Sequence, residues 1–132
     1  MLPVLGAVTY LAAVVALWGL TSLLLDTDPI DYPDAGPLLG PAIVAAATVV
    51  TFVALWRIRR TRARSWVLVA LAGTYVLTVL VGAAGYALTR SDPSWLVLAA
   101  GHFAVSPFVL EAAALSALAA AVIRASKPVI RA

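Results

Sequence analysis

The sequence predicts an all-α integral membrane protein, a four-helix bundle of four transmembrane helices with both termini on the cytoplasmic side (N-in/C-in). Of its 132 residues, 64% are hydrophobic and only 11% are charged, and the mean hydropathy is +1.04. A soluble core cannot use that much apolar surface, whereas helices of about 20 apolar residues cross a bilayer. Four such helices use nearly the whole chain, so we expect a single transmembrane domain.

The first predicted crossing is the apolar run 2–25. A cleaved signal peptide has basic residues before a shorter apolar stretch, and small residues at its cleavage site. No Lys or Arg precedes this run, which ends in Leu23, Leu24 and Leu25. We therefore expect the segment to be retained as a membrane helix.

Residues 26–37 form the predicted outer loop, which carries four aspartates and three prolines but no basic residue. The aspartates are Asp26, Asp28, Asp31 and Asp34. Carboxylate oxygens suit Ca²⁺, yet the Gly and terminal Glu of an EF-hand loop are missing. The prolines also restrict how the carboxylates converge. A hydrated acidic loop is favoured over a metal site, and we expect no metal and no cofactor.

The second predicted crossing, 38–56, leads into an Arg-rich loop at 57–65. Thr48 and Thr51 share a helix face, and we expect their hydroxyls to bond back to their own helix. The loop lies between Trp56 and Trp66. It holds five of the nine basic residues: Arg57, Arg59, Arg60, Arg62 and Arg64. Short basic loops stay cytoplasmic and Trp residues lie at headgroup level, so this loop is predicted to face the cytoplasm and contact lipid headgroups.

The third predicted crossing, 66–89, carries a stripe of mostly small residues that recur every fourth position. The stripe consists of Ala70, Thr74, Thr78, Gly82 and Tyr86. Small residues at this spacing let helix backbones approach closely in lipid, where hydrophobicity cannot drive helix association. Packing within one chain is favoured over a dimer interface.

An outer turn at 90–94, a fourth crossing at 95–123 and a basic tail at 124–132 complete the predicted topology. Counting crossings puts the Arg-rich loop and the tail on one side of the membrane and the four-aspartate loop on the other. The positive-inside rule is thus satisfied twice by one arrangement. The excess of Arg over Lys, with abundant Ala, Val and Leu, suggests a GC-rich bacterial genome and therefore a bacterial plasma membrane.

Glu111 is the only acidic residue well inside a predicted crossing. A carboxylate near the middle of a bilayer costs roughly 2.5 to 3.5 kcal/mol on insertion scales, so such residues face a bundle interior, a cavity or a partner. Counting from the cytoplasmic ends of the helices, Tyr75, Thr78 and Thr48 come level with Glu111 to within about a turn. These residues are therefore candidate hydrogen-bond partners for a protonated Glu111, an arrangement that requires no transport role.

The other candidate residues of the fourth crossing are His102, Ser106 and Pro107. Pro107 lacks an N–H, so a kink is predicted there. His102 and Ser106 are four residues apart and share a face, whereas Glu111 points almost opposite to His102 in a straight helix. A lone His cannot supply the ligand set of a haem or a structural metal, so a packing role near the outer interface is favoured for His102.

Several function classes are disfavoured by composition. The chain has no Cys, which removes disulfides and thiolate metal sites. The basic residues lie at helix ends rather than along an exposed face, so nucleic-acid binding is not expected. We also expect no enzymatic activity, because Ser106 and His102 lie on one helix with no carboxylate partner and no oxyanion site.

In size and number of crossings the chain resembles small multidrug-resistance transporters, whose essential membrane Glu lies in the first helix. The first crossing here has no acidic residue. In size and number of crossings it also resembles fluoride channels, although it contains no Asn. It is similar in the same respects to the small accessory subunit of actinobacterial cytochrome oxidases, with which it shares no motif. These resemblances concern size and layout only, and no family is assigned from motifs.

Two hypotheses follow from the residues. The first is a structural or accessory subunit that packs against itself or a larger membrane complex. It would use the small-residue faces of the third and fourth crossings, the latter including Ala113, Ala117 and Ala121. The second is a small oligomeric transporter coupled to protons or cations through Glu111. The first is favoured, because a transport cycle needs more polar lining than this chain displays.

Overall fold

The computed structural model describes residues 1–27 and 37–126, and within these ranges the only regular secondary structure is helical. Four of the helices are long and apolar enough to cross a membrane, and the fifth, α4, is a shorter apolar helix. The helices are α1 (Leu2–Leu25), α2 (Leu39–Thr61), α3 (Ser65–Arg90), α4 (Trp95–Ala104) and α5 (Pro107–Ala125).

Helix α1 coincides with the predicted first crossing. It ends at Asp26, whose φ of 50° is left-handed. The N–H groups of Asp26 and Thr27 both donate to the carbonyl of Ser22, which satisfies a carbonyl that the end of the helix leaves without a partner. Most of the predicted acidic loop, including Asp28, Asp31 and Asp34, lies outside the described residues.

Helix α2 extends beyond the predicted crossing. The predicted Arg-rich loop 57–65 is wrong in its extent, because residues 57–61 are helical and only 62–64 link α2 to α3. Arg is a good helix former, so a run of arginines does not end a helix. The helix stops at Arg62, which has a φ of 52° and donates its N–H to the carbonyl of Ile58.

Helix α3 spans the predicted third crossing plus one residue at each end. It ends at Ser91, whose φ is 53°. In the outer turn that follows, the Asp92 carboxylate accepts hydrogen bonds from the N–H of Ser94 at 3.0 Å and its hydroxyl at 2.8 Å. These bonds lower the pKa of Asp92 from its ordinary value, the backbone bond contributing most.

The prediction of one continuous fourth helix over 95–123 is wrong, so the described residues hold five helices, of which four are long and apolar enough to span a membrane. The chain leaves the helical conformation at Val105 and Ser106, and α5 begins at Pro107. The proline ring disfavours the helical region for the residue before it, and Ser106 has an extended ψ of 129°. The predicted kink is therefore a complete break, which divides the segment into a 10-residue and a 19-residue helix.

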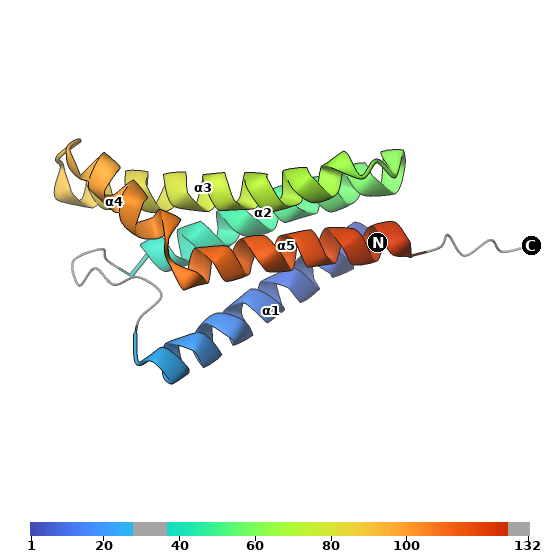
Figure 1. The fold of residues 1–132 in the computed structure, drawn as a ribbon, viewed down its shortest axis with the longest axis horizontal. Helices are drawn as coiled ribbons and strands as arrows, with labels where there is room; N and C mark the ends of the chain where they lie inside the picture. Colours follow the sequence, from blue (N-terminus) through green and yellow to red (C-terminus); the bar gives the residue numbers. More distant parts are fainter. Residues whose placement is uncertain (28–36, 127–132) are drawn as a thin grey trace, which may run out of the picture.

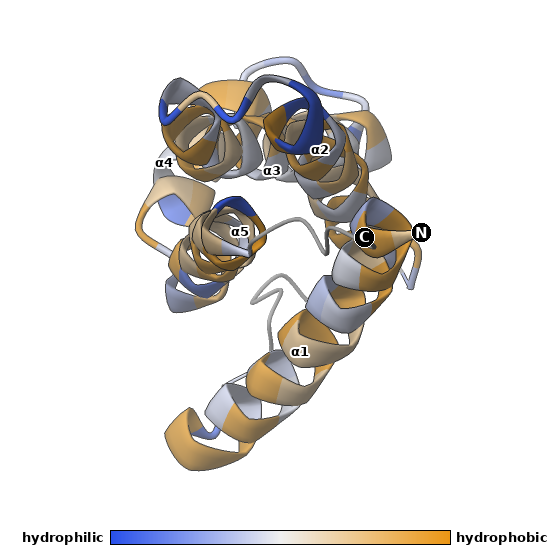
Figure 2. Ribbon diagram, turned by 90° about the vertical axis from the view of Figure 1, so that its right-hand side faces the viewer, coloured by the Kyte–Doolittle hydropathy of each residue, from blue (hydrophilic) through white to orange (hydrophobic). Residues whose placement is uncertain are grey.

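Helix α3 packs against α2, α4 and α5, whereas α1 packs against α2 and α5. Figure 1 shows that α1 runs at an angle across the bundle and diverges from it toward Leu25. The N-terminus, the α2–α3 link and the C-terminal end of α5 lie at one end of the molecule. Figure 2 looks onto this end and shows hydrophilic residues on the link and at the end of α5, with apolar residues along the helices.

Candidate functional site

Glu111 lies in the second turn of α5 and faces α1. The Thr21 hydroxyl of α1 donates to Glu111 Oε1 at 2.7 Å. Glu111 Oε2 is buried and has no hydrogen-bond partner among the described residues. Burying a carboxyl oxygen without a hydrogen-bond donor costs free energy. A proton, a water molecule or an ion bound at this oxygen would lower that cost.

The three candidate partners of Glu111 donate their hydrogen bonds to backbone carbonyls instead. The hydroxyls of Thr48 and Thr78 donate to carbonyls of their own helices, at 2.8 Å and 2.7 Å respectively. The Tyr75 hydroxyl donates to the carbonyl of Ala104 at 2.6 Å. The bond of Thr48 to its own helix is the expected one. Counting along straight helices gave the depth of Glu111 but not the neighbouring helix that it faces.

Two aromatic side chains of α1 bind the first turns of α5 beside Glu111. The Tyr10 hydroxyl donates to the carbonyl of Ala112, and Trp18 Nε1 donates to the carbonyl of Phe108, each at 2.9 Å. The Trp18 and Phe108 rings meet edge to face at 5.8 Å. Together with the bond between Thr21 and Glu111, these contacts define the α1–α5 seam.

The break between α4 and α5 leaves carbonyls without their usual helical donors. The Phe103 carbonyl accepts from the N–H of Ser106 at 3.2 Å, and the Ala104 carbonyl accepts from the Tyr75 hydroxyl described above. Inside a membrane such groups need partners within the protein. Tyr75 therefore closes the end of α4, and the break is compatible with membrane depth.

His102 and Ser106 do not form the shared helix face that a continuous helix predicted. His102 is half-buried near the end of α4 and meets the Phe103 ring edge to face at 5.8 Å. Ser106 is buried beyond the end of α4 and precedes α5. Among the described residues there is no cluster of three or more His, Cys, Asp or Glu side chains that could hold a metal ion.

A hydroxyl cluster that the sequence reading missed joins α2, α3 and α5. Ser116 Oγ lies 2.8 Å from Thr51 Oγ1 and 3.0 Å from Thr74 Oγ1, and all three residues are fully buried. Thr51 also donates to the carbonyl of Ala47, the expected bond to its own helix. The available signal was Ser116 itself, a small polar residue among the apolar residues of α5.

The stripe on α3 faces the interior, where Ala70, Thr74, Thr78 and Gly82 are all buried. A methyl group added at Gly82 would lie 2.9 Å from the Phe103 ring, so α3 and α4 approach closely there. On α5, Ala113 is buried, Ala117 is half-buried and Ala121 is exposed. Packing within the chain uses Ala112, Ser116 and Ala120, the set of the same spacing one residue earlier.

The five arginines of the predicted basic loop are all exposed: Arg57, Arg59, Arg60, Arg62 and Arg64. The Arg60 guanidinium lies 4.5 Å from the centre of the Trp56 ring, and that of Arg57 lies 5.8 Å from the centre of Trp66. At the opposite end of α3, Arg90 lies 4.6 Å from the centre of the Trp95 ring. Such cation–π pairs are typical of amphipathic anchors at an interface.

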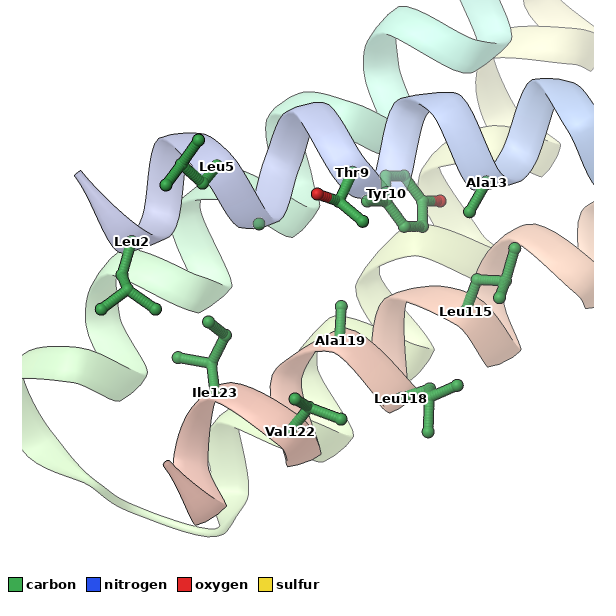
Figure 3. A pocket seen from close by; sticks show the side chains of 11 residues that line it. Leu2, Leu5, Thr9, Tyr10, Ala13, Leu115, Leu118, Ala119, Val122 and Ile123 are labelled. Atoms are coloured by element: carbon green, nitrogen blue, oxygen red, sulfur yellow. The ribbon is translucent and has the colours of Figure 1, made fainter. Parts of the chain in front are cut away.

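Two apolar grooves border α1. One lies between α1 and α5, has a volume of about 390 Å³ and is lined by residues that include Leu5, Leu118 and Val122. Figure 3 shows Leu2 and Thr9 of α1, and Ala119 and Ile123 of α5, in the space between the two helices. The other, of about 680 Å³, lies between α1 and α2 and is lined by residues that include Trp18 and Val44.

Over residues 1–27 and 37–126 the fold is therefore all-helical, with four apolar helices of membrane-spanning length. Within that class, the chain belongs to DUF6121, a family of unknown function, whose family model matches residues 1–131. No curated protein and no solved structure matches the chain.

Proposed function

We propose that this protein is a non-enzymatic structural or accessory subunit of a bacterial plasma membrane, crossing it four times with both termini in the cytoplasm. The supporting observation is how the polar side chains of the bundle are used. The hydroxyl of Ser116 bonds to those of Thr51 and Thr74. Three aromatic side chains donate to backbone carbonyls: Tyr10, Trp18 and Tyr75. The two grooves that border α1 are lined almost wholly by apolar side chains. This arrangement suits a static bundle more than a polar passage.

The topology can be tested because the chain has no Cys. A single Cys introduced as Ser94→Cys should react with a membrane-impermeant maleimide added to intact cells. The matched variant Arg64→Cys should react only after the cells are opened, since both positions are exposed but lie at opposite ends of α3. The reverse labelling pattern would overturn the proposed orientation, and labelling of both variants in intact cells would overturn membrane embedding.

Association is proposed to use the outward face of α5 around Ala121, because the small-residue stripe of α3 is buried within the bundle. The partner is another membrane protein or a second copy. Ala121 on α5 and Ala12 on α1 are both exposed, which makes them a matched pair. At native expression in mild detergent, Ala121→Trp should reduce the size of the native complex, whereas Ala12→Trp should leave it unchanged. Equal sizes for the wild type and Ala121→Trp would exclude this face.

A proton- or cation-coupled transporter is the second candidate, supported by the buried Glu111 Oε2, which has no hydrogen-bond partner among the described residues. Glu111→Gln in proteoliposomes separates the two functions. If the variant assembles normally but loses a pH-dependent flux, the transporter function is correct and the accessory function is wrong. If neither the wild type nor Glu111→Gln carries a flux, and Glu111→Gln no longer associates with the partner, the transporter function is wrong.

A further inference from the structure

We propose that the hollow lined by Trp56, Arg57 and Arg60, at the end of α2, is a binding site for a doubly charged phosphate group. The phosphate is carried by a lipid headgroup or is free in solution, and a lipid source rests on the membrane embedding proposed above. The inference differs from the general attraction of basic loops to headgroups, because it assigns binding to two of the five exposed arginines and not to the other three.

The hollow has the size of a small anion site. Its volume is about 110 Å³, and two of its three lining residues are positively charged. Ligands of drug size occupy roughly 300–1,000 Å³, whereas one water molecule takes about 30 Å³ of liquid. The hollow therefore admits a group of the size of a few water molecules, such as a phosphate. The two grooves that border α1 have no charged residue in their lining.

Both guanidinium groups are oriented by tryptophan rings. That of Arg60 lies 4.5 Å from the centre of the Trp56 ring, and that of Arg57 lies 5.8 Å from the centre of Trp66, in the first turn of α3. A guanidinium that lies over an aromatic ring keeps its N–H groups in its own plane, where they can still donate. The rings thus restrict the two side chains without using their hydrogen bonds.

Neither of these two guanidinium groups is engaged by another polar group in residues 1–27 and 37–126. The arginine side chains that donate hydrogen bonds there are those of Arg62, Arg90 and Arg124. The described carboxylate side chains lie elsewhere: at the end of α1, in the outer turn and on α5 facing α1. Two positive charges therefore meet one hollow with no described counter-charge.

The charge and the number of donors favour a phosphate monoester or inorganic phosphate over other anions. Such a group carries about −1.5 to −2 charges at pH 7 and has three strong acceptor oxygens. Each guanidinium can bind two oxygens through parallel hydrogen bonds. A carboxylate has only two oxygens, and both a carboxylate and a phosphodiester carry less charge. In the proposed topology, Trp56 and Trp66 place the hollow at the level of the cytoplasmic headgroups.

The first experiment measures lipid retention by native mass spectrometry of the full chain purified in mild detergent. Phosphatidic acid, a monoester, and phosphatidylglycerol, a diester, are added in turn with identical acyl chains. The wild type should retain phosphatidic acid in preference. Arg57→Gln and Arg60→Gln should each reduce its retention about fivefold, the effect of one basic residue at an anionic surface. Arg59→Gln is the matched control, because Arg59 is exposed in the same turn of α2 but does not line the hollow.

Arg60→Lys separates the site from simple charge attraction. It keeps the positive charge but removes the planar group that stacks on Trp56 and binds two oxygens, so retention of phosphatidic acid should again fall. Circular dichroism should show the wild-type helix content in all four variants. Full retention in Arg60→Lys, or a loss in Arg59→Gln equal to that in Arg60→Gln, would overturn the site.

The second experiment identifies the source of the phosphate. Inorganic phosphate is titrated into the wild type and the same variants, with binding followed by calorimetry. Preferential retention of phosphatidic acid that depends on Arg57 and Arg60 assigns a lipid headgroup. Binding of inorganic phosphate with the same dependence, without a lipid preference, assigns free phosphate, and the absence of both overturns the site. A protein recovered without detergent would refute the membrane proposal, and the calorimetry would then decide the site by itself.

Discussion

Helices α1 and α3 are similar in length, 24 and 26 residues, and both are apolar enough to cross a membrane, yet they are packed very differently. The buried face of α3 is built mainly from Ala, Thr and Gly, whereas that of α1 includes Tyr10, Val14 and Trp18. Both apolar grooves described above border α1. In lipid, helix association depends on close packing rather than on the hydrophobic effect. The small residues on the buried face of α3 let its neighbours approach closely, as Phe103 does at Gly82.

The polar groups of the two helices differ in the same way. Thr74 of α3 belongs to a cluster in which every hydroxyl has a partner. Thr21 of α1 donates to a carboxyl group whose second oxygen is buried and has no hydrogen-bond partner in the part of the chain that the structure describes. We therefore expect the neighbourhood of α3 to supply most of the stability of the bundle, and the α1–α5 seam to be the part that tolerates change.

Gly82→Val should have the largest effect, because a side chain there would collide with the Phe103 ring. We expect a loss of about 1–3 kcal/mol in the free energy of unfolding, the usual cost of overpacking, measured by denaturant titration in mixed micelles. Gly101→Val is the control, since no atom lies within 4 Å of a methyl group added at Gly101. Equal losses for the two variants would show that α3 and α4 are not closely packed.

Ser116→Ala should have the next largest effect. It removes the shared partner of Thr51 and Thr74, and polar contacts between membrane helices contribute about 0.6–1.7 kcal/mol. The same titration should show a loss of about 1 kcal/mol. Thr48→Val provides the comparison, because Thr48 bonds only to its own helix, and its loss should stay below about 0.5 kcal/mol. An unchanged free energy of unfolding in Ser116→Ala would mean that the cluster does not stabilise the bundle.

Glu111→Gln should change the free energy of unfolding by no more than about 0.6 kcal/mol. The Gln carbonyl can still accept from Thr21, and the amide replaces an oxygen that has no partner among the described residues. Thr21→Val, measured alongside, should fall in the same range. A loss above 2 kcal/mol for either variant would reverse the comparison and place the main polar contact of the bundle at the α1–α5 seam.

The smallest effect is expected at the exposed carboxylate of Asp92, a contrast to the buried Glu111. Its pKa is lowered in the folded protein by the backbone N–H and the hydroxyl of Ser94. The stability that this provides is present above the ordinary pKa of Asp and is lost as the pH falls through the lowered pKa. Ser94→Ala should move the Asp92 pKa back toward its ordinary value, as followed by carbon-13 NMR titration. An unchanged titration would assign the whole shift to the backbone bond.

Sequence reasoning located the apolar helices well, because hydropathy and length act locally. It placed α1 at its observed bounds and α3 to within one residue at each end. It extended the basic loop too far into α2, since charge marks the membrane boundary rather than the end of a helix. It recognised Pro107 as a disruption but predicted a kink where a break exists, because a partner for the freed Ala104 carbonyl, Tyr75, comes from another helix.

What the sequence determined by itself is the all-helical class, the apolar helices of membrane-spanning length and the clustering of arginines between two of them. These follow from composition and from the spacing of residues along one chain. Only the tertiary structure decided that Thr21 faces Glu111, that Ser116 joins Thr51 to Thr74, and that α1 is bordered by grooves. Such pairings depend on the rotation and tilt of each helix about its neighbours, and these are set by side-chain packing between segments far apart in the chain.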